Sequence, residues 1–319
     1  MQVVGQDAAI RAIQVAVAGA HNLIMVGPPG GGKTLLASCV SSILPAMDEH
    51  EALEVTCIQS VAGAVSPDGL ARERPFRRPH HTVSPAGMLG GGNPPLPGEV
   101  TLAHRGVLYL DEFCEFPRRV VESLRGPMED GFIVVSRSRG TVNFPSRFML
   151  IASANPCPCG YLGDPERACV CQGAALMRYR RKLAGPVIDR IDIQIEVPRV
   201  RRSGLEKPIA LLTSNGVRNE IEQARARQAE RFGQKGLTNS TMAPRRIESA
   251  AHLAPGARTL LLDAVDHMAL SVRAYHKLIR VARTIADLDG SGSVADEHVL
   301  EALQYRVLES EPRTVLAYG

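Results

Sequence analysis

The amino-acid sequence predicts an α/β fold, with a parallel β-sheet core followed by an all-helical region. Four short apolar runs of the kind that form buried parallel strands support the sheet: residues 22–26, 106–110, 148–154 and 191–197. From about residue 206 the apolar residues recur with helical spacing instead, over 207–232, 257–268, 271–288 and 294–307. We therefore expect two domains, a core over residues 1–205 and a helical domain over residues 206–319.

The composition excludes several classes of protein. The chain has 319 residues, of which 45% are hydrophobic and 22% charged, as in a globular protein and unlike a disordered one. The formal net charge is only +4, so a nucleic-acid site must be a local patch, and 4% aromatic residues without tryptophan argue against a base-stacking platform. The sequence has no apolar run of about 18 residues and no secretory leader, so we expect a cytoplasmic protein with no membrane partner.

The first apolar run leads into a glycine-rich loop and then into a helix. Residues 7–19 predict an earlier helix, capped by Asp7 and ended by Gly19. Residues 27–34 read Gly-Pro-Pro-Gly-Gly-Gly-Lys-Thr, which fits the phosphate-binding pattern G-x-x-x-x-G-K-[ST] in its strand–loop–helix context. Backbone N–H groups of such a loop surround the phosphates, Lys33 reaches the β- and γ-phosphates, and the Thr34 hydroxyl ligates Mg²⁺. The candidate nucleotide-binding residues here are Gly27, Pro28, Pro29, Gly30, Gly31, Gly32, Lys33, Thr34 and Leu35.

Polar residues end the next two apolar runs. Asp111 and Glu112 follow the run 106–110, and Asn155 follows the run 148–154. The carboxyl ends of parallel strands form the edge at which ligands bind. Asp111 would therefore complete the Mg²⁺ shell, Glu112 would polarise the attacking water, and Asn155 would contact that water or the γ-phosphate. Such residues alone are ordinary surface or turn chemistry, and the glycine loop is what favours an ATPase with ATP and Mg²⁺ as its cofactors.

Further strings accompany these motifs in a fixed order: Val4-Gly5-Gln6, His21-Asn22-Leu23, Phe76-Arg-Arg-Pro-His-His81, Asn155-Pro-Cys-Pro-Cys-Gly-Tyr161, Asp189-Arg190-Ile191-Asp192 and Leu270-Ser-Val-Arg-Ala-Tyr-His276. Over nearly its whole length, the chain resembles the magnesium-chelatase-like AAA+ proteins of the ComM (YifB) type. The resemblance implies an AAA+ core with a parallel sheet and a hairpin ahead of sensor 1, then a helical lid like the magnesium-chelatase C-terminal region. Such proteins carry a degenerate Lon-protease-like domain before the ATPase, and we expect this chain to lack it, because its Gly5-Gln6 box stands near residue 1.

The resemblance also implies roles for individual residues. Val4 and Gln6 correspond to contacts on the adenine side, and Asn155 to sensor 1. Arg190 corresponds to the arginine finger that reaches the γ-phosphate of a neighbouring subunit, and Arg273 to sensor 2 on the lid.

Both arginines have plainer interpretations. Arg190 could form a salt bridge with Asp189 or Asp192. Arg273, in the first turn of a helix that Ser271 would cap, could be a solvated helix charge.

The resemblance further implies a homo-oligomeric ring, expected to be a hexamer, because an arginine finger acts on a neighbour's ATP. The output would be a DNA motor: a helicase or branch-migration factor for recombination of incoming DNA during natural transformation (competence). The alternative is an ATP-driven chelatase-type or MoxR-like motor that remodels a protein partner.

Two segments would determine which substrate the motor binds. Residues 63–104 are so rich in glycine and proline that we expect a long structureless loop, which corresponds to the pore-facing helix-2 insert of the family or else to a surface loop. Residues 132–144 predict a β-hairpin with Arg137 and Arg139 at its tip. Arginines gathered at a pore would bind DNA phosphates, whereas the simpler interpretation is an edge hairpin kept soluble by charge.

Four of the seven cysteines form two C-x-C pairs: Cys157, Cys159, Cys169 and Cys171. Four thiolates can close a tetrahedral zinc site, although C-x-C is tighter than the usual C-x₂-C spacing. Structural Zn²⁺, free thiols and a redox disulfide all remain compatible with the sequence.

Overall fold

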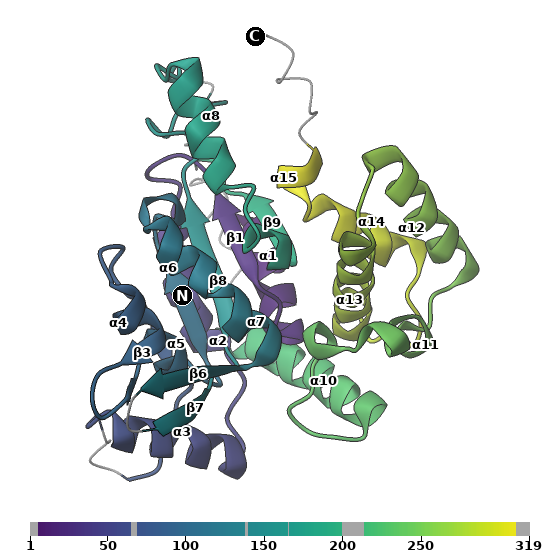
Figure 1. Ribbon diagram of the computed structural model, residues 1–319. Coiled ribbons are helices and arrows are strands. Elements are labelled where there is room, and N and C mark those ends of the chain that lie inside the picture. Colours follow the sequence, from purple (N-terminus) through teal and green to yellow (C-terminus); the bar gives the residue numbers. More distant parts are fainter. Residues whose placement is uncertain (1–5, 65–68, 138–139, 165, 200–213, 311–319) are drawn as a thin grey trace. The chain divides into compact units, whose positions relative to one another are not determined.

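The computed structural model in Figure 1 describes residues 6–64, 69–137, 140–164, 166–199 and 214–310. It confirms the α/β core and the helical region after it. The main sheet has five strands in the order β2-β5-β8-β1-β9. Their bounds are Phe76–Arg77 (β2), Val107–Leu110 (β5), Met149–Ala154 (β8), Leu23–Val26 (β1) and Ile193–Glu196 (β9). All four apolar runs of the sequence form strands of this sheet, and β2 is an edge strand that the sequence pattern did not show.

The register of the sheet aligns the functional strand ends. β5 pairs in parallel with β2 and with β8, with Val107 opposite Met149 and Leu110 opposite Ala152. Every residue of β1, β5 and β8 is buried, as expected for parallel strands covered on both faces. In consequence, Asp111 and Ser153, which come next on the two strands, meet at the carboxyl edge.

The chain forms two compact units, Met25–Ile191 and the combination of Met1–Ile24 with Asp192–Gly319. We call them the nucleotide unit and the helical unit. The domain boundary expected at residue 205 falls within residues 200–213, outside the described residues. The helices of the nucleotide unit are α2 (Lys33–Ile43), α3 (Glu49–Val61), α4 (Pro85–Leu89), α5 (Glu99–Leu102), α6 (Arg118–Ser123), α7 (Arg125–Asp130) and α8 (Gly173–Lys182), with 3₁₀ turns η1 (Phe113–Glu115) and η2 (Ile188–Arg190).

The glycine- and proline-rich stretch is not the structureless loop that its composition suggested. Its described residues hold β2, α4, α5 and a two-stranded ribbon of β3 (Gly90–Gly91) and β4 (Leu96–Pro97). The Ser84 hydroxyl accepts a hydrogen bond from the Gly87 N–H (3.1 Å), and Pro85 occupies the first position of α4. A cap and a preset proline thus start a single helical turn where no long helix could form.

The expected hairpin is confirmed. Strands β6 (Phe132–Arg137) and β7 (Gly140–Pro145) pair antiparallel, from Phe132 opposite Pro145 to Arg137 opposite Gly140. Arg139 lies outside the described residues, and only the backbone of Arg137, the last residue of β6, is described.

Helix α13 (Val272–Leu288) is the centre of the helical unit, and both α1 (Asp7–Gly19) and α10 (Ser214–Phe232) pack against it. It buries charged as well as apolar side chains, among them Arg283 and Asp287. The expected cap is present, since the Ser271 hydroxyl accepts from the Ala274 N–H (3.2 Å). The other elements of this unit are β9, η3 (Asn239–Thr241), η4 (Pro244–Arg246), α11 (Ile247–Ala251), α12 (Pro255–Met268), α14 (Asp296–Gln304) and α15 (Val307–Ser310).

One capping prediction for α1 is wrong. Asp7 is the first residue of the helix, while Gln6 occupies the cap position and makes no side-chain capping bond. The helix does end at Gly19, as predicted, and Ala20 turns into the left-handed region (φ 54°). Among the described residues, no helix combines the length and apolarity that a membrane crossing requires.

Candidate nucleotide site and cysteine cluster

The glycine loop joins β1 to α2 and presents its backbone donors. Gly30 and Gly32 adopt positive φ values of 78° and 84°, which allow the chain to turn tightly. The loop is tied to the sheet where the Gly27 N–H donates to the Ala154 carbonyl (3.1 Å). No side chain caps α2, so the N–H groups of its first turn can bind an anion.

Lys33 is the first residue of α2, and its side chain reaches back to the start of this loop. Its ammonium group donates to the carbonyl oxygens of Gly27 (2.6 Å) and Pro28 (2.9 Å) and to the Asn155 side-chain oxygen (3.2 Å). Burial lowers the pKa of Lys33, and the charges of Asp111 and Glu112 oppose that change. A half-buried cation held by neutral oxygens is a group to which an anionic phosphate can bind strongly.

Asp111 collects four donors. Its Oδ1 accepts from the hydroxyls of Tyr109 (2.8 Å) and Ser153 (2.5 Å), and its Oδ2 from the Thr34 hydroxyl (3.2 Å) and the Arg78 guanidinium (2.5 Å). Burial alone would raise the pKa of Asp111, but these donors outweigh it and hold the pKa below its ordinary value. Asp111 therefore offers an ionised oxygen next to the Thr34 hydroxyl, a pair that could hold Mg²⁺ at a nucleotide.

Glu112 differs from its neighbour. Its side chain is exposed, its backbone lies in the left-handed region (φ 54°), and its N–H donates to the Ser153 hydroxyl (3.2 Å). The backbone turn separates the two adjacent carboxylates, so that one binds within the site while the other faces solvent.

The structure brings together four of the predicted site residues: Lys33, Asp111 and Asn155, which were predicted as catalytic, and Thr34, which was predicted as a Mg²⁺ ligand. The sheet order explains this, because β8 lies between β1 and β5 and so carries Asn155 between the loop and Asp111. Leu35 is exposed on the first turn of α2.

Other predicted residues lie outside this group. Gln6 and Arg273 belong to the helical unit; Gln6 is buried and donates to the Pro198 carbonyl (2.8 Å), and Arg273 is exposed in the first turn of α13. Val4 lies outside the described residues.

Arg190 lies in η2 and is buried within its own unit. Its Nη1 donates to the Pro186 carbonyl (2.6 Å), and its Nη2 pairs with the Glu129 carboxylate on α7. The residue thus has an ion-pair partner that the sequence did not suggest, since Asp189 and Asp192 were the acids considered.

Sequence reasoning missed three residues of the site: Arg78, Tyr109 and Ser153. Tyr109 and Ser153 each precede a predicted site residue by two positions, which is the repeat that places side chains on one face of a strand. Arg78 stands in the string that begins at Phe76, but no local pattern indicates that it reaches Asp111.

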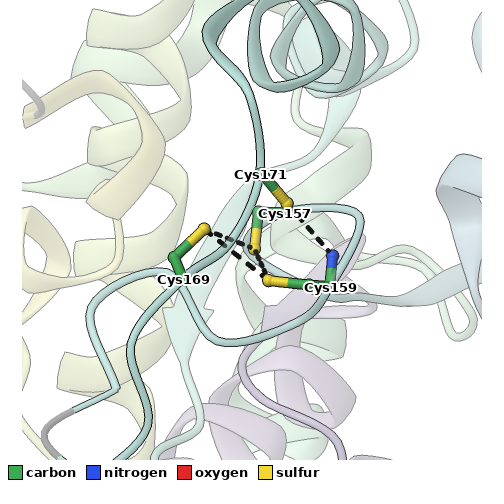
Figure 2. A group of neighbouring side chains, drawn as sticks. All are labelled: Cys157, Cys159, Cys169 and Cys171. Atoms are coloured by element: carbon green, nitrogen blue, oxygen red, sulfur yellow. Dashed lines mark hydrogen bonds between the residues drawn. The ribbon is translucent and has the colours of Figure 1, made fainter.

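The four clustered cysteines converge, as Figure 2 shows. All four sulfur atoms lie within 4.8 Å of one another. Sulfur–sulfur separations are 3.4 Å for Cys157–Cys159, 3.7 Å for Cys157–Cys169 and 3.6 Å for Cys159–Cys169. The Cys171 sulfur accepts from the Cys159 backbone N–H (3.3 Å). The two C-x-C pairs thus gather into one group that could hold a metal ion, despite their tight spacing.

Comparisons with known proteins agree with this arrangement. Residues 1–205 match the family model of magnesium chelatase, subunit ChlI, and residues 212–306 match that of magnesium chelatase, subunit ChlI C-terminal. The chain is 40% identical over 309 residues to the uncharacterized protein YifB of Escherichia coli (strain K12). It is 41% identical over 308 residues to the competence protein ComM of Haemophilus influenzae.

These alignments cover 96% of this chain but 60% and 59% of the two relatives. The chain thus spans about three fifths of their length. A more distant similarity, 24% identity over 334 residues, links it to the magnesium-chelatase 38 kDa subunit of Acidiphilium rubrum, covering 93% of this chain and 86% of that protein.

Proposed function

Because the chain belongs to the magnesium-chelatase-like AAA+ ATPases, with YifB and ComM among its relatives, we propose that it is an ATP-hydrolysing ring motor acting on DNA. The observation that supports ATP hydrolysis most strongly is the convergence of Lys33, Thr34, Asp111 and Asn155 at one edge of the sheet. These are the groups that phosphoryl transfer from a Mg²⁺-bound nucleotide needs.

In this proposal each group of the site has one task. The loop N–H groups and Lys33 would hold the β- and γ-phosphates, and Thr34 and Asp111 would hold Mg²⁺, which would supply positive charge at the phosphates. Glu112, exposed beside Asp111, polarises the attacking water, and Asn155 contacts that water or the γ-phosphate. The Arg78 guanidinium, which pairs with the same carboxylate, would compete with Mg²⁺ for Asp111.

The proposed roles outside this group come from the family resemblance. Val4 and Gln6 would contact adenine, and Arg273 would act as sensor 2. Arg190 would be the finger of a neighbouring subunit in a hexameric ring, which requires it to leave Glu129 when subunits assemble. Such an arginine is worth about 10³–10⁵ in rate in measured systems.

The test of the ATPase is Glu112→Gln, with Glu115→Gln as its matched control. Both glutamates are exposed and three residues apart. The Glu112 variant should bind ATP but stall hydrolysis, and the Glu115 variant should hydrolyse ATP like the wild type. Wild-type turnover by Glu112→Gln would remove Glu112 from the catalytic site.

For DNA, the supporting observation is the hairpin of β6 and β7, in which Arg137 is the last residue of β6. In the sequence, Arg139 stands between the two strands. Replacing both arginines by alanine should weaken DNA binding and reduce its salt dependence by roughly 0.9 in slope for each DNA phosphate that is no longer neutralised. The control is alanine at Arg118 and Arg119, exposed arginines on α6 whose replacement changes the charge equally.

DNA binding is measured on forked and four-way DNA at fixed salt, and basal ATPase activity should survive in both double variants. Binding as tight as that of the wild type would favour the alternative, a chelatase-type or MoxR-like motor acting on a protein partner.

We also propose that the four cysteines hold one structural Zn²⁺, since four convergent sulfurs are a complete ligand set for it. Elemental analysis should find about one zinc per chain. Near-zero zinc in protein never exposed to a chelator would favour free thiols instead. Reduced thiols and DNA as substrate both suit the cytoplasm.

A further inference from the structure

The cysteine cluster joins the two ends of the segment 157–171, which follows strand β8. Cys157 comes two residues after Asn155, and Cys171 comes two residues before the first residue of α8. The segment between the two pairs holds no helix or strand among its described residues. Its conformation therefore depends on what joins its ends, and the four sulfurs are at that junction (Figure 2).

One residue of this segment touches the phosphate loop. Gly160, which adopts a φ of 84°, approaches so closely that a Cβ there would lie 2.5 Å from the Cδ of Pro29 and 2.7 Å from its Cγ. The same Cβ would lie 3.8 Å from the Cγ of Asn155. Gly160 is thus packed against both the glycine loop and the predicted sensor.

The far end of the segment is anchored to the same site. Tyr179 is buried on α8; burial and the nearby Cys114 thiol raise its pKa, and the backbone of Asn155 lowers it. The ammonium group of Lys182 donates to the Cys114 carbonyl (2.6 Å), just after the Asp111-Glu112 pair. The cluster therefore lies between two contacts with the nucleotide machinery, one at Gly160 and one through α8.

We propose that zinc at the four cysteines braces the phosphate loop, so that metal occupancy and nucleotide affinity are coupled. This inference rests on the proposed ATPase function and zinc site. Metal bonds to all four sulfurs fix the position of Gly160, which in turn holds Pro29 and the Asn155 side chain that accepts from Lys33. Without metal the segment is held by weak thiol contacts, and part of the nucleotide's binding free energy must then order it.

The first test compares nucleotide affinity of zinc-loaded and chelator-stripped wild-type protein, using a fluorescent ADP analogue. Stripping should weaken binding at least about tenfold, or about 1.4 kcal/mol. Coupling is reciprocal, so saturating ADP should strengthen zinc retention against a chelator by the same factor. Circular dichroism checks that the stripped protein remains folded.

The second test leaves all four cysteines in place. Gly160→Ala forces a side chain into Pro29, whereas Gly163→Ala, in the same segment and also at positive φ (78°), meets nothing within 4 Å. Both variants should contain zinc, but only Gly160→Ala should bind ADP more weakly. Adding Pro29→Ala should restore part of the loss beyond what the two single changes predict.

The outcomes separate the proposals. Equal ADP affinity of loaded and stripped protein, or of the two glycine variants, overturns the brace and leaves the ATPase standing. Protein that never contains zinc overturns both the zinc site and the brace. Absence of nucleotide binding by the zinc-loaded wild type overturns the ATPase proposal itself.

Discussion

Two clusters of charged side chains, one in each compact unit, use the same chemistry in different surroundings. In the helical unit, the Asp287 carboxylate binds Arg231 and Arg283, and the side chains of Asp287 and Arg283 are both 0% exposed. In the nucleotide unit, Asp111 binds Arg78 at 2.5 Å, with side-chain exposures of 22% and 51%. Both carboxylates are paired, as charges away from water must be, but a ligand can reach only the second.

Their remaining partners sharpen the contrast. The Asn239 amide (2.8 Å) also donates to Asp287, and Arg283 reaches the carbonyls of Ala251, Ser291 and Gly292. That cluster joins several segments of the helical unit, and its carboxylate is fully buried. Ion pairing therefore does not distinguish a functional site from a structural one in this protein, whereas exposure of the paired groups does.

The largest effect on stability is expected when the buried cluster around Asp287 loses its carboxylate. Asp287→Ala leaves Arg283 buried without its charge partner, which should lower the free energy of unfolding by about 3–5 kcal/mol. Asp289→Ala is the control, because Asp289 pairs with Arg11 at an exposed site and should cost about 1 kcal/mol or less. Urea denaturation measures both, and equal costs would contradict the structural assignment of the Asp287 cluster.

In the exposed cluster around Asp111 and Lys33, a substitution should weaken ligand binding more than it lowers the stability of the fold. Lys33→Ala removes the ammonium group that faces the phosphates and should weaken ATP binding by about 2–5 kcal/mol, or at least about 30-fold. Stability should change little, because burial already disfavours the charged form of this lysine. Titration with ATP and thermal melting are compared with Lys235→Ala, at an exposed lysine of the helical unit. Tight ATP binding by the Lys33 variant would place the phosphates elsewhere.

Asp192 is a second buried and paired carboxylate of the helical unit, and the pH dependence of stability tests its role. Burial would raise the pKa of Asp192, but His21, whose Nδ1 lies 3.6 Å from the Asp192 Oδ2, and the charges of Lys277 and Arg280 lower it overall. A lowered pKa stabilises the fold above the ordinary aspartate value and loses that effect as pH falls through the folded-state value. Asp192→Asn should therefore cost about 1–3 kcal/mol at neutral pH, and the difference should shrink below about pH 4. A cost that persists unchanged in acid would mean that packing rather than charge is lost.

The smallest effect is expected at Arg78. Its guanidinium pairs with the Asp111 carboxylate that would hold Mg²⁺, so Arg78→Ala should lower the Mg²⁺ concentration needed for half-maximal ATPase activity. The shift should be at most about fivefold, since half-exposed ion pairs are worth about 1 kcal/mol or less. Arg77→Ala is a matched control, because the adjacent Arg77 pairs with Glu99 at 2.8 Å. An increased Mg²⁺ requirement in Arg78→Ala would show that this arginine assists the metal.

The sequence predicted those parts of the site that lie within one continuous motif or at the end of one strand. Lys33 and Thr34 follow from the loop pattern, and Asp111 and Asn155 from strand ends that the sheet brings together. The hairpin and α13 followed from apolar periodicity and a serine cap.

What the sequence did not predict depends on partners distant along the chain. Arg78 reaches Asp111 across 33 residues, and Arg190 meets Glu129 across 61. Helix α3 did carry a local signal that was overlooked, since Asp48 and Glu51 form a capping box at its start. The contact of Gly160 with Pro29 leaves no trace in periodicity, because it joins two irregular segments.

The division of the chain has a consequence for synthesis on the ribosome. The nucleotide unit is one continuous segment, whereas the helical unit is completed only when α10 and α13 reach α1. Arg225 of α10 donates to the Val17 carbonyl of α1 across 208 residues, and Gln228 to Ala18 across 210. The nucleotide unit can therefore fold while later residues are still being translated. Until α10 and α13 have been synthesised, the apolar face of α1 lacks its helical partners. When the Ile193 N–H bonds to the Asn22 carbonyl (3.0 Å), the two ends of the nucleotide unit are joined. Most of the entropy cost of closing the chain is then already met before the remaining helices pack against α1.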